Sequence, residues 1–240
     1  KSTASHALQD EPLKRALSGI KHGFVANRAR ARGNLPEFEQ LRDEAKAIKE
    51  HTLAHLDLYL EAYEEKVVSS GGHVHWASTA DEARAAILDI CRKAGARTVT
   101  KGKSMVGEEI AINEHLEANG ITPVETDLGE YLIQLRKEPP SHIIAPAIHL
   151  TREQVEEDFR RTHTKLPADR VLDEPSQLVA EARAILREKF LTADVGITGA
   201  NLLIAETGTS IIVTNEGNGD LTQCLPRIHI VIASIEKTVP

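Results

Sequence analysis

The sequence predicts an α/β protein with a mixed, mainly parallel sheet, preceded by a helical segment. From residue 71 onward, short β-rich runs alternate with helical periodicity, which indicates a parallel sheet with right-handed crossovers. Late in the chain, two β-rich runs flank a tight turn, which predicts an antiparallel hairpin. Before residue 71 the periodicity is helical throughout. We therefore expect a helical segment over residues 1–70 and an α/β domain over residues 71–240.

The N-terminal segment is predicted to be helical because apolar and neutral residues recur at steps of three and four. Gly33, Asn34 and Pro36 interrupt the helix before this stripe begins. A basic cluster precedes the break, and it either binds a partner or a phosphate or forms a solvated helix face. The stripe comprises Leu41, Ala45, Ile48, Thr52, His55, Tyr59 and Ala62, and the basic cluster comprises Lys21, Arg28, Arg30 and Arg32.

The α/β domain begins with a short strand predicted at residues 74–76. Thr79 and Glu82 form a capping-box pattern that opens a helix, which Gly95 ends. The elements predicted after it are strands at residues 97–101 and 121–126, with a helix between them that Ser104 caps and Gly120 closes. Helices follow at residues 128–136, after Thr151 and from Pro175 to about residue 190, then the hairpin strands 202–205 and 210–214 and a strand at 228–233.

Composition limits the function classes. The net charge of −7 argues against general nucleic-acid binding, which needs a basic surface. No stretch reaches the ~20 apolar residues of a membrane span. Two cysteines exclude a disulfide framework and any all-cysteine iron–sulfur or zinc site, which needs about four thiolates. We expect a reduced, cytoplasmic protein, and a chain that is part of a longer one because it begins with Lys1 rather than Met.

The end of the strand predicted at residues 97–101 is a candidate anion site. Lys101 and Lys103 supply positive charge, and the helix that begins after Ser104 favours an anion at its N-terminus. The alternative is a plain turn with a helix cap. Arg97 stands where a nucleotide-binding P-loop needs glycine, so that motif is excluded. Glu109 is predicted to face the sheet, where Lys101 or Lys103 would pair with it as a catalytic or a structural group.

The end of the next strand carries three carboxylates, those of Glu125, Asp127 and Glu130. They could hold a cation or act as an acid or base, with Asp127 as the catalytic candidate, or they could cap the following helix. Histidine pairs suggest metal ligands by their spacing, but neither has an obvious third ligand, so no metal site is expected. These pairs are His51 with His55 and His73 with His75.

The late hairpin contains a further acidic candidate. If Thr207 and Gly208 form a two-residue loop, Glu206 continues the apolar face of the strand before it, and it could act as a base or nucleophile. Asn201 and Asn215 could line a polar pocket, or serve as ordinary turn residues. Because ligands gather beyond the carboxyl ends of strands in open α/β sheets, we expect the lysines of the early loop and Glu206 to meet in one hollow.

Several of these segments together resemble the lactate utilization (LUD) domain family, over about residues 20–240. The matching segments are residues 101–105, 108–110, 125–131, 139–147, 199–201, 205–209, 214–218 and 235–237. The resemblance implies a three-layer α/β/α fold of the NagB/RpiA/CoA-transferase-like type. It is strongest to the iron–sulfur subunit of a bacterial system that oxidises L-lactate to pyruvate with partner proteins A and C.

In that subunit, the resemblance implies two [4Fe-4S] clusters in a C-terminal region whose cysteine motifs this chain lacks. It also implies that the LUD domain binds a small carboxylate or a partner near the residues named above. Two other readings stay open, a stand-alone enzyme of the CoA-transferase or sugar-phosphate-isomerase type that uses Glu206 and Lys103, and a scaffold whose helices dock proteins A and C.

Overall fold

The computed structural model describes residue 5 and residues 7–141 and 145–240. The chain divides into two compact units, and each is discontinuous in sequence. One contains residues 1–42 and 128–185, and the other contains residues 43–127 and 186–240. The division at residue 70 into a helical segment and an α/β domain stays a prediction. Segments distant in sequence pack together, which local periodicity does not report.

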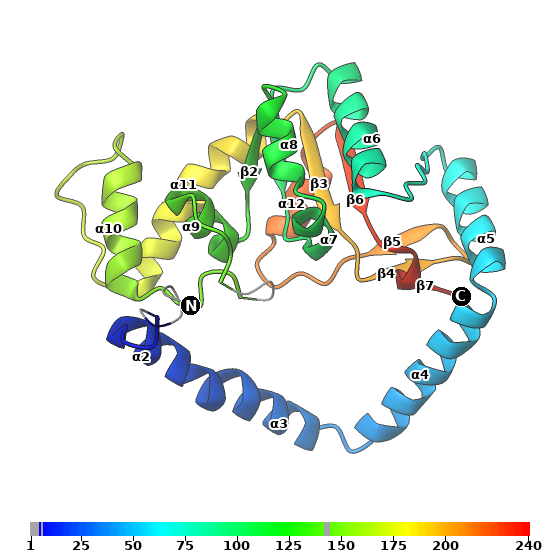
Figure 1. The fold of residues 1–240 in the computed structure, drawn as a ribbon, viewed down its shortest axis with the longest axis horizontal. Helices are drawn as coiled ribbons and strands as arrows, with labels where there is room; N and C mark the ends of the chain where they lie inside the picture. Colours follow the sequence, from blue (N-terminus) through cyan, green and yellow to red (C-terminus); the bar gives the residue numbers. More distant parts are fainter. Residues whose placement is uncertain (1–4, 6, 142–144) are drawn as a thin grey trace. The chain divides into compact units, whose positions relative to one another are not determined.

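A four-stranded parallel sheet forms the centre of the second unit, in the order β2-β1-β3-β6 (Figure 1). The strands are β1 (Thr98–Lys101), β2 (Thr122–Glu125), β3 (Val195–Gly199) and β6 (Ile228–Ile232). The predicted α/β class with a mainly parallel sheet is therefore confirmed. The central strand β3 was missed, because its two glycines weaken the β-rich pattern by which strands are recognised.

One face of this sheet carries the apolar core. Because paired residues of parallel strands share a face, Val99, Val195 and Ile228 point the same way. They pack with helices α6 (Ala80–Lys93) and α8 (Ile112–Ala118) through buried aliphatic side chains. The predicted capping of α6 is confirmed, since the Thr79 side chain accepts a hydrogen bond from the Glu82 amide.

The opposite face is covered by helix α12 (Asn218–Cys224) at a very close approach. A Cβ atom added to Gly196 would lie 1.9 Å from the carbonyl oxygen of Thr222. The glycine in β3 therefore lets the helix backbone approach the sheet, and the unit has helices on both faces of the sheet.

The late strands form a second sheet, in the order β5-β4-β7. These strands are β4 (Leu202–Ile204), β5 (Thr209–Ile211) and β7 (Thr238–Val239). The predicted hairpin is confirmed, but it does not extend the parallel sheet. It packs on helix α5 (Leu56–Ser69), where Tyr63 is buried with Leu203 and Ala205. The Tyr63 hydroxyl lies 2.8 Å from the Ser210 hydroxyl.

Two predicted elements differ locally. Residues 74–76 form no strand: they lie in the connection between α5 and α6, and their side chains are half-buried or exposed. The helix expected from Ser104 to Gly120 is broken into α7 (Met105–Glu109) and α8, because Ala111 adopts a left-handed conformation between them, with φ 49°. A residue in the left-handed region interrupts the helical hydrogen bonds, and the chain changes direction there.

The first unit consists of helices. Its C-terminal part contains α9 (Leu128–Arg136), α10 (Arg152–Thr162) and most of α11 (Pro175–Thr192), all predicted from the sequence. Thr151 and Gln154 form a complete capping box at the start of α10. Its N-terminal part contains α2 (Glu11–Ile20), the π-helical turn η1 (Lys21–Val25), α3 (Ala26–Gly33) and the start of α4 (Phe38–Ala54).

Candidate functional site

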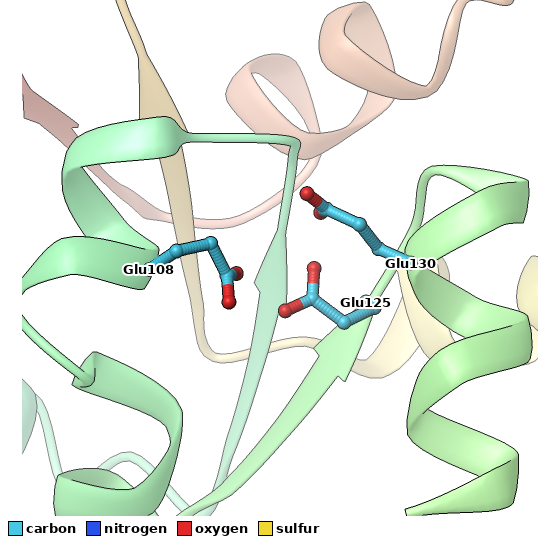
Figure 2. A group of neighbouring side chains, drawn as sticks. All are labelled: Glu108, Glu125 and Glu130. Carbon is cyan, nitrogen blue, oxygen red and sulfur yellow. The ribbon is translucent and has the colours of Figure 1, made fainter. Parts of the chain in front are cut away.

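Lys101 is a fully buried cation held between two carboxylates at the carboxyl end of the inner strand β1. Its ammonium group lies 2.9 Å from Glu125 Oε1 and 3.0 Å from Glu108 Oε1. Figure 2 shows the side chains of Glu108 and Glu125 directed toward each other. A buried charge requires such partners, because taking an isolated ammonium group out of water costs several kcal/mol.

The strand register explains why these groups meet. Lys101 and Glu125 are the last residues of neighbouring parallel strands and are register partners. The side chain of Thr126 then donates a hydrogen bond to the Lys101 carbonyl oxygen at 2.9 Å, and its amide donates to the same oxygen at 3.0 Å. The carboxyl end of β1 is thus fixed, and this is the edge where ligands bind in open α/β sheets.

Helices α7 and α8 complete the cluster. Ser104 caps α7 by accepting a hydrogen bond from the Gly107 amide at 3.0 Å, which places Glu108 over the end of β1. After the left-handed Ala111, Asn113 in α8 donates to Glu125 Oε1 at 2.5 Å. The break that was not predicted in this helix therefore brings an amide to the site.

The charges define what the cluster can do. The Lys101 ammonium group is already paired with two carboxylates, so it is not available as an anchor for an anion. Glu125 is 3% exposed, whereas the Glu108 side chain is 30% exposed. Glu108 is therefore the member that solvent reaches, and it is suited to exchange a proton.

The prediction that Glu109 faces the sheet is wrong. Glu109 and Met105 are exposed, and the neighbouring Glu108 takes the inward position. Helix α7 begins at Met105 and ends after five residues, so the helical phase carried on to Ile112 does not apply across the break. Glu108 and Asn113 were missed for the same reason.

At Ser104, where an anion site was predicted, the structure shows the alternative role, a helix cap. Ser104 is buried, and its hydroxyl oxygen is occupied by the cap hydrogen bond to Gly107. A Cβ atom at Gly199 would lie 3.3 Å from that oxygen, so β3 also closes over it. Lys103 is half-buried beside this cap.

The three carboxylates at and after the end of β2 have different surroundings. Glu125 belongs to the Lys101 cluster. Asp127 is half-buried and contributes, after burial itself, to raising the pKa of Glu216. Glu130 is buried in helix α9 of the other unit.

Glu206 is exposed in the loop at the hairpin tip. The pairing of Ile204 with Thr209 leaves a loop of residues 205–208, not the predicted two-residue loop. Gly208 adopts φ +69°, and a Cβ atom there would lie 2.7 Å from the Val67 amide nitrogen in α5. The tip therefore packs on α5, and Glu206 does not continue the apolar face.

These contacts do not support a hollow shared by Lys103 and Glu206. The Lys103 backbone borders Gly199 at the end of β3, whereas the loop of Glu206 borders α5. Thr207 donates to the Thr209 hydroxyl at 2.8 Å, which is turn chemistry. The other hairpin candidates also serve the turn or remain exposed. Asn201 Oδ1 accepts from the Val213 amide at 2.8 Å, and Asn215 is exposed.

A second buried polar cluster lies within the first unit and was missed by the sequence analysis. Glu181 accepts from Arg170 at 2.6 Å and lies 2.7 Å from His163 Nδ1, while His163 Nε2 lies 2.8 Å from the Tyr131 hydroxyl. Burial raises the pKa of the Glu181 carboxyl, but the hydrogen bonds from Arg170 and His163 outweigh it, and the net pKa is lowered. Burial and the Glu181 charge raise the pKa of Tyr131 to about 12. This cluster ties α9, α10 and α11 together, and no periodicity signals it.

A comparison with protein families matches the LUD domain over residues 60–240. The chain belongs to the LUD domain family. Of the segments on which the resemblance was based, residues 142–144 lie outside the part that the structure describes.

The LUD chain is similar over its full length to proteins named lactate utilization protein B. It is 44% identical to that of Bacillus licheniformis over 241 residues, 43% identical to that of Bacillus subtilis over 245, and 42% identical to that of Macrococcus caseolyticus over 241. The chain spans about half the length of these relatives. No solved structure matches it. Among the described helices, none combines the length and apolar character needed to cross a membrane.

Proposed function

We propose that this chain is the LUD portion of a protein that takes part in lactate utilization, in the cytoplasm, as part of an electron-transferring subunit. The observation that carries the proposal is the 41–44% identity with lactate utilization proteins B along the whole chain. The reaction we propose for the complete system, with partner proteins A and C, is oxidation of L-lactate to pyruvate. It releases two electrons and two protons.

The electrons would pass to iron–sulfur clusters, which this chain cannot ligate by itself. A [4Fe-4S] cluster takes about four cysteine thiolates, and the sequence contains two cysteines. Cys91 is buried, and burial raises the pKa of its thiol to about 11, which disfavours the thiolate that binds iron. Cysteines elsewhere in the system would hold the two clusters, and we derive no step through them.

The proposed contribution of the LUD portion is proton handling at the Lys101 cluster. The lactate hydroxyl loses a proton when it becomes a ketone, and a carboxylate near solvent is a suitable acceptor. Glu108 is partly exposed, and Lys101 holds its carboxylate in place from the interior. Glu108 is thus the proposed acceptor, while Lys101 and Glu125 are positioning residues.

The test is lactate-dependent reduction of a dye by the complete protein together with its partner proteins. Glu108→Gln should lower kcat by at least tenfold while the variant stays folded, because Glu125 still pairs with the Lys101 ammonium group. Glu114→Gln, an exposed carboxylate in α8, is the matched control and should leave the rate unchanged. Equal rates for both variants would exclude Glu108. Loss of activity in Glu109→Gln alone would favour the acid predicted from the sequence.

A further inference from the structure

The N-terminal helices are rich in basic residues, and most of their described side chains are exposed. Residues 11–33 contain six lysines and arginines and one carboxylate, although the whole chain has a net charge of −7. Helix α3 contains no buried residue, and Val25, just before it, is 59% exposed. Helices α2, η1 and α3 follow one another without a gap from Glu11 to Gly33, and most helical stability in proteins comes from packing, so a partner surface would stabilise this exposed stretch.

One strip of this segment combines an apolar residue with two cations. Val25, Arg28 and Arg32 follow one another at steps of three and four, so they share a face. Ala29 and Gly33 lie along the same strip, and all five residues are exposed. Arg28 has no ion pair with any residue that the structure describes, whereas Arg32 pairs with Glu39.

Helix α5 carries a strip of the same spacing and the opposite charge. Leu58, Glu61 and Glu65 also follow at steps of three and four, and Leu58 is 61% exposed. Glu61 and Glu65 are exposed and have no ion pair within the described ranges. The other side of α5 is occupied by the hairpin sheet, through the buried Tyr63, so this strip faces outward.

We propose that the strip of Val25, Arg28 and Arg32 in one copy of the chain docks on the strip of Leu58, Glu61 and Glu65 in a second copy. The apolar residues would contact each other, and each arginine would face a glutamate, because both pairs of charges are separated by one helical turn. This match of spacing favours a second copy over a general anionic surface, which requires no spacing.

Two-fold symmetry doubles the contact. In a reciprocal dimer, each chain offers its basic strip and receives that of its partner, so every contact occurs twice. A stable interface buries on the order of 1,200–2,000 Å² in total, which two such helix pairs can supply more readily than one.

Sedimentation equilibrium of the chain tests the proposal. The expected mass is twice the 26.3 kDa of one chain at micromolar concentration, with dissociation promoted by salt. Arg28→Glu should raise the dimer dissociation constant at least tenfold. Arg30→Glu makes the same charge change on the opposite side of α3 and should change it less than threefold. Circular dichroism checks that both variants keep their helices.

The charge-swapped chain Arg28→Glu with Glu61→Arg should recover dimerisation to within threefold of the original. A mass of 26.3 kDa at every concentration would overturn the proposal. The same result is expected if the basic strip docks on α5 of its own chain, so that arrangement would also overturn it. Equal effects of Arg28→Glu and Arg30→Glu would also overturn it. Binding of a monomer to vesicles with anionic headgroups, but not to neutral ones, would assign the basic strip to lipid instead.

Discussion

Replacing Lys101 with methionine removes a buried ammonium group that pairs with two carboxylates, one of them buried, and the structure sets the size of the effect. The substitution keeps the length and apolar stem of the side chain, so packing changes little. The ion pairs to Glu125 at 2.9 Å and to Glu108 at 3.0 Å are lost, and Glu125 remains 3% exposed. Breaking a buried pair costs about 3–5 kcal/mol. For a chain of this length, that corresponds to a fall in Tm of roughly 6–20 °C.

The assay is urea unfolding followed by circular dichroism, with a thermal melt as a second measure. Lys93→Met is the matched control, since its ammonium group makes an exposed ion pair with Asp89 at 2.6 Å. That loss should cost no more than about 0.5 kcal/mol. Adding Glu125→Gln to Lys101→Met should recover part of the lost stability, because it removes one of the uncompensated charges. A cost below 1 kcal/mol for Lys101→Met, or a double variant less stable than the single one, would refute the reasoning.

Three further predictions concern other parts of the chain. Gly196→Ala should destabilise the protein by at least about 3 kcal/mol, measured by urea unfolding, because the new Cβ atom would lie 1.9 Å from a backbone oxygen of α12. Glu181→Gln should cost about 3–5 kcal/mol at pH 7, since it leaves Arg170 without its carboxylate partner. With an ordinary thiol reagent, exposed Cys224 should react in the folded state, and buried Cys91 only on unfolding.

The controls for these predictions are as follows. Gly33→Ala, where nothing lies within 4 Å of the new Cβ atom, should be neutral or slightly stabilising, and an equal loss at both glycines would contradict the close approach. The lowered pKa of Glu181 contributes stability above the unfolded value near 4.3, which is lost as pH falls through the folded value. The original chain and Glu181→Gln should therefore converge in stability at acid pH, and a constant difference down to pH 2 would be inconsistent with this account. Two thiols that react at the same rate without denaturant would show that Cys91 is accessible.

Much of the fold could be predicted from local pattern. The helix after Thr79, the capping box at Thr151 and the strand at β1 follow from side-chain chemistry within a few residues. Strand β3 could not be recognised from its residue types, because glycine has a low strand propensity. Gly196 stands there because it allows α12 to approach closely. The break at Ala111 was also missed, since alanine has no preference for the left-handed region that it adopts there.

The candidate site was predicted in part. Lys101 and Glu125 were named because both stand at strand ends, and the sheet brings them together. Glu108 was missed in favour of Glu109, because the helical phase depends on where α7 begins and ends. Glu206 was an attractive candidate by alternation, but the loop length set by the pairing of Ile204 with Thr209 exposes it.

The α/β class, the family, the capping of the helices and the presence of charge at the end of β1 could all be recognised from the order of the amino acids. Each of these depends on residues close in the chain or on the whole pattern of motifs. Only the tertiary structure decided which carboxylates surround Lys101 and that the hairpin forms its own sheet on α5. Those outcomes depend on backbone approach and helix phase between distant segments, which are set by packing and not by any local property of the residues.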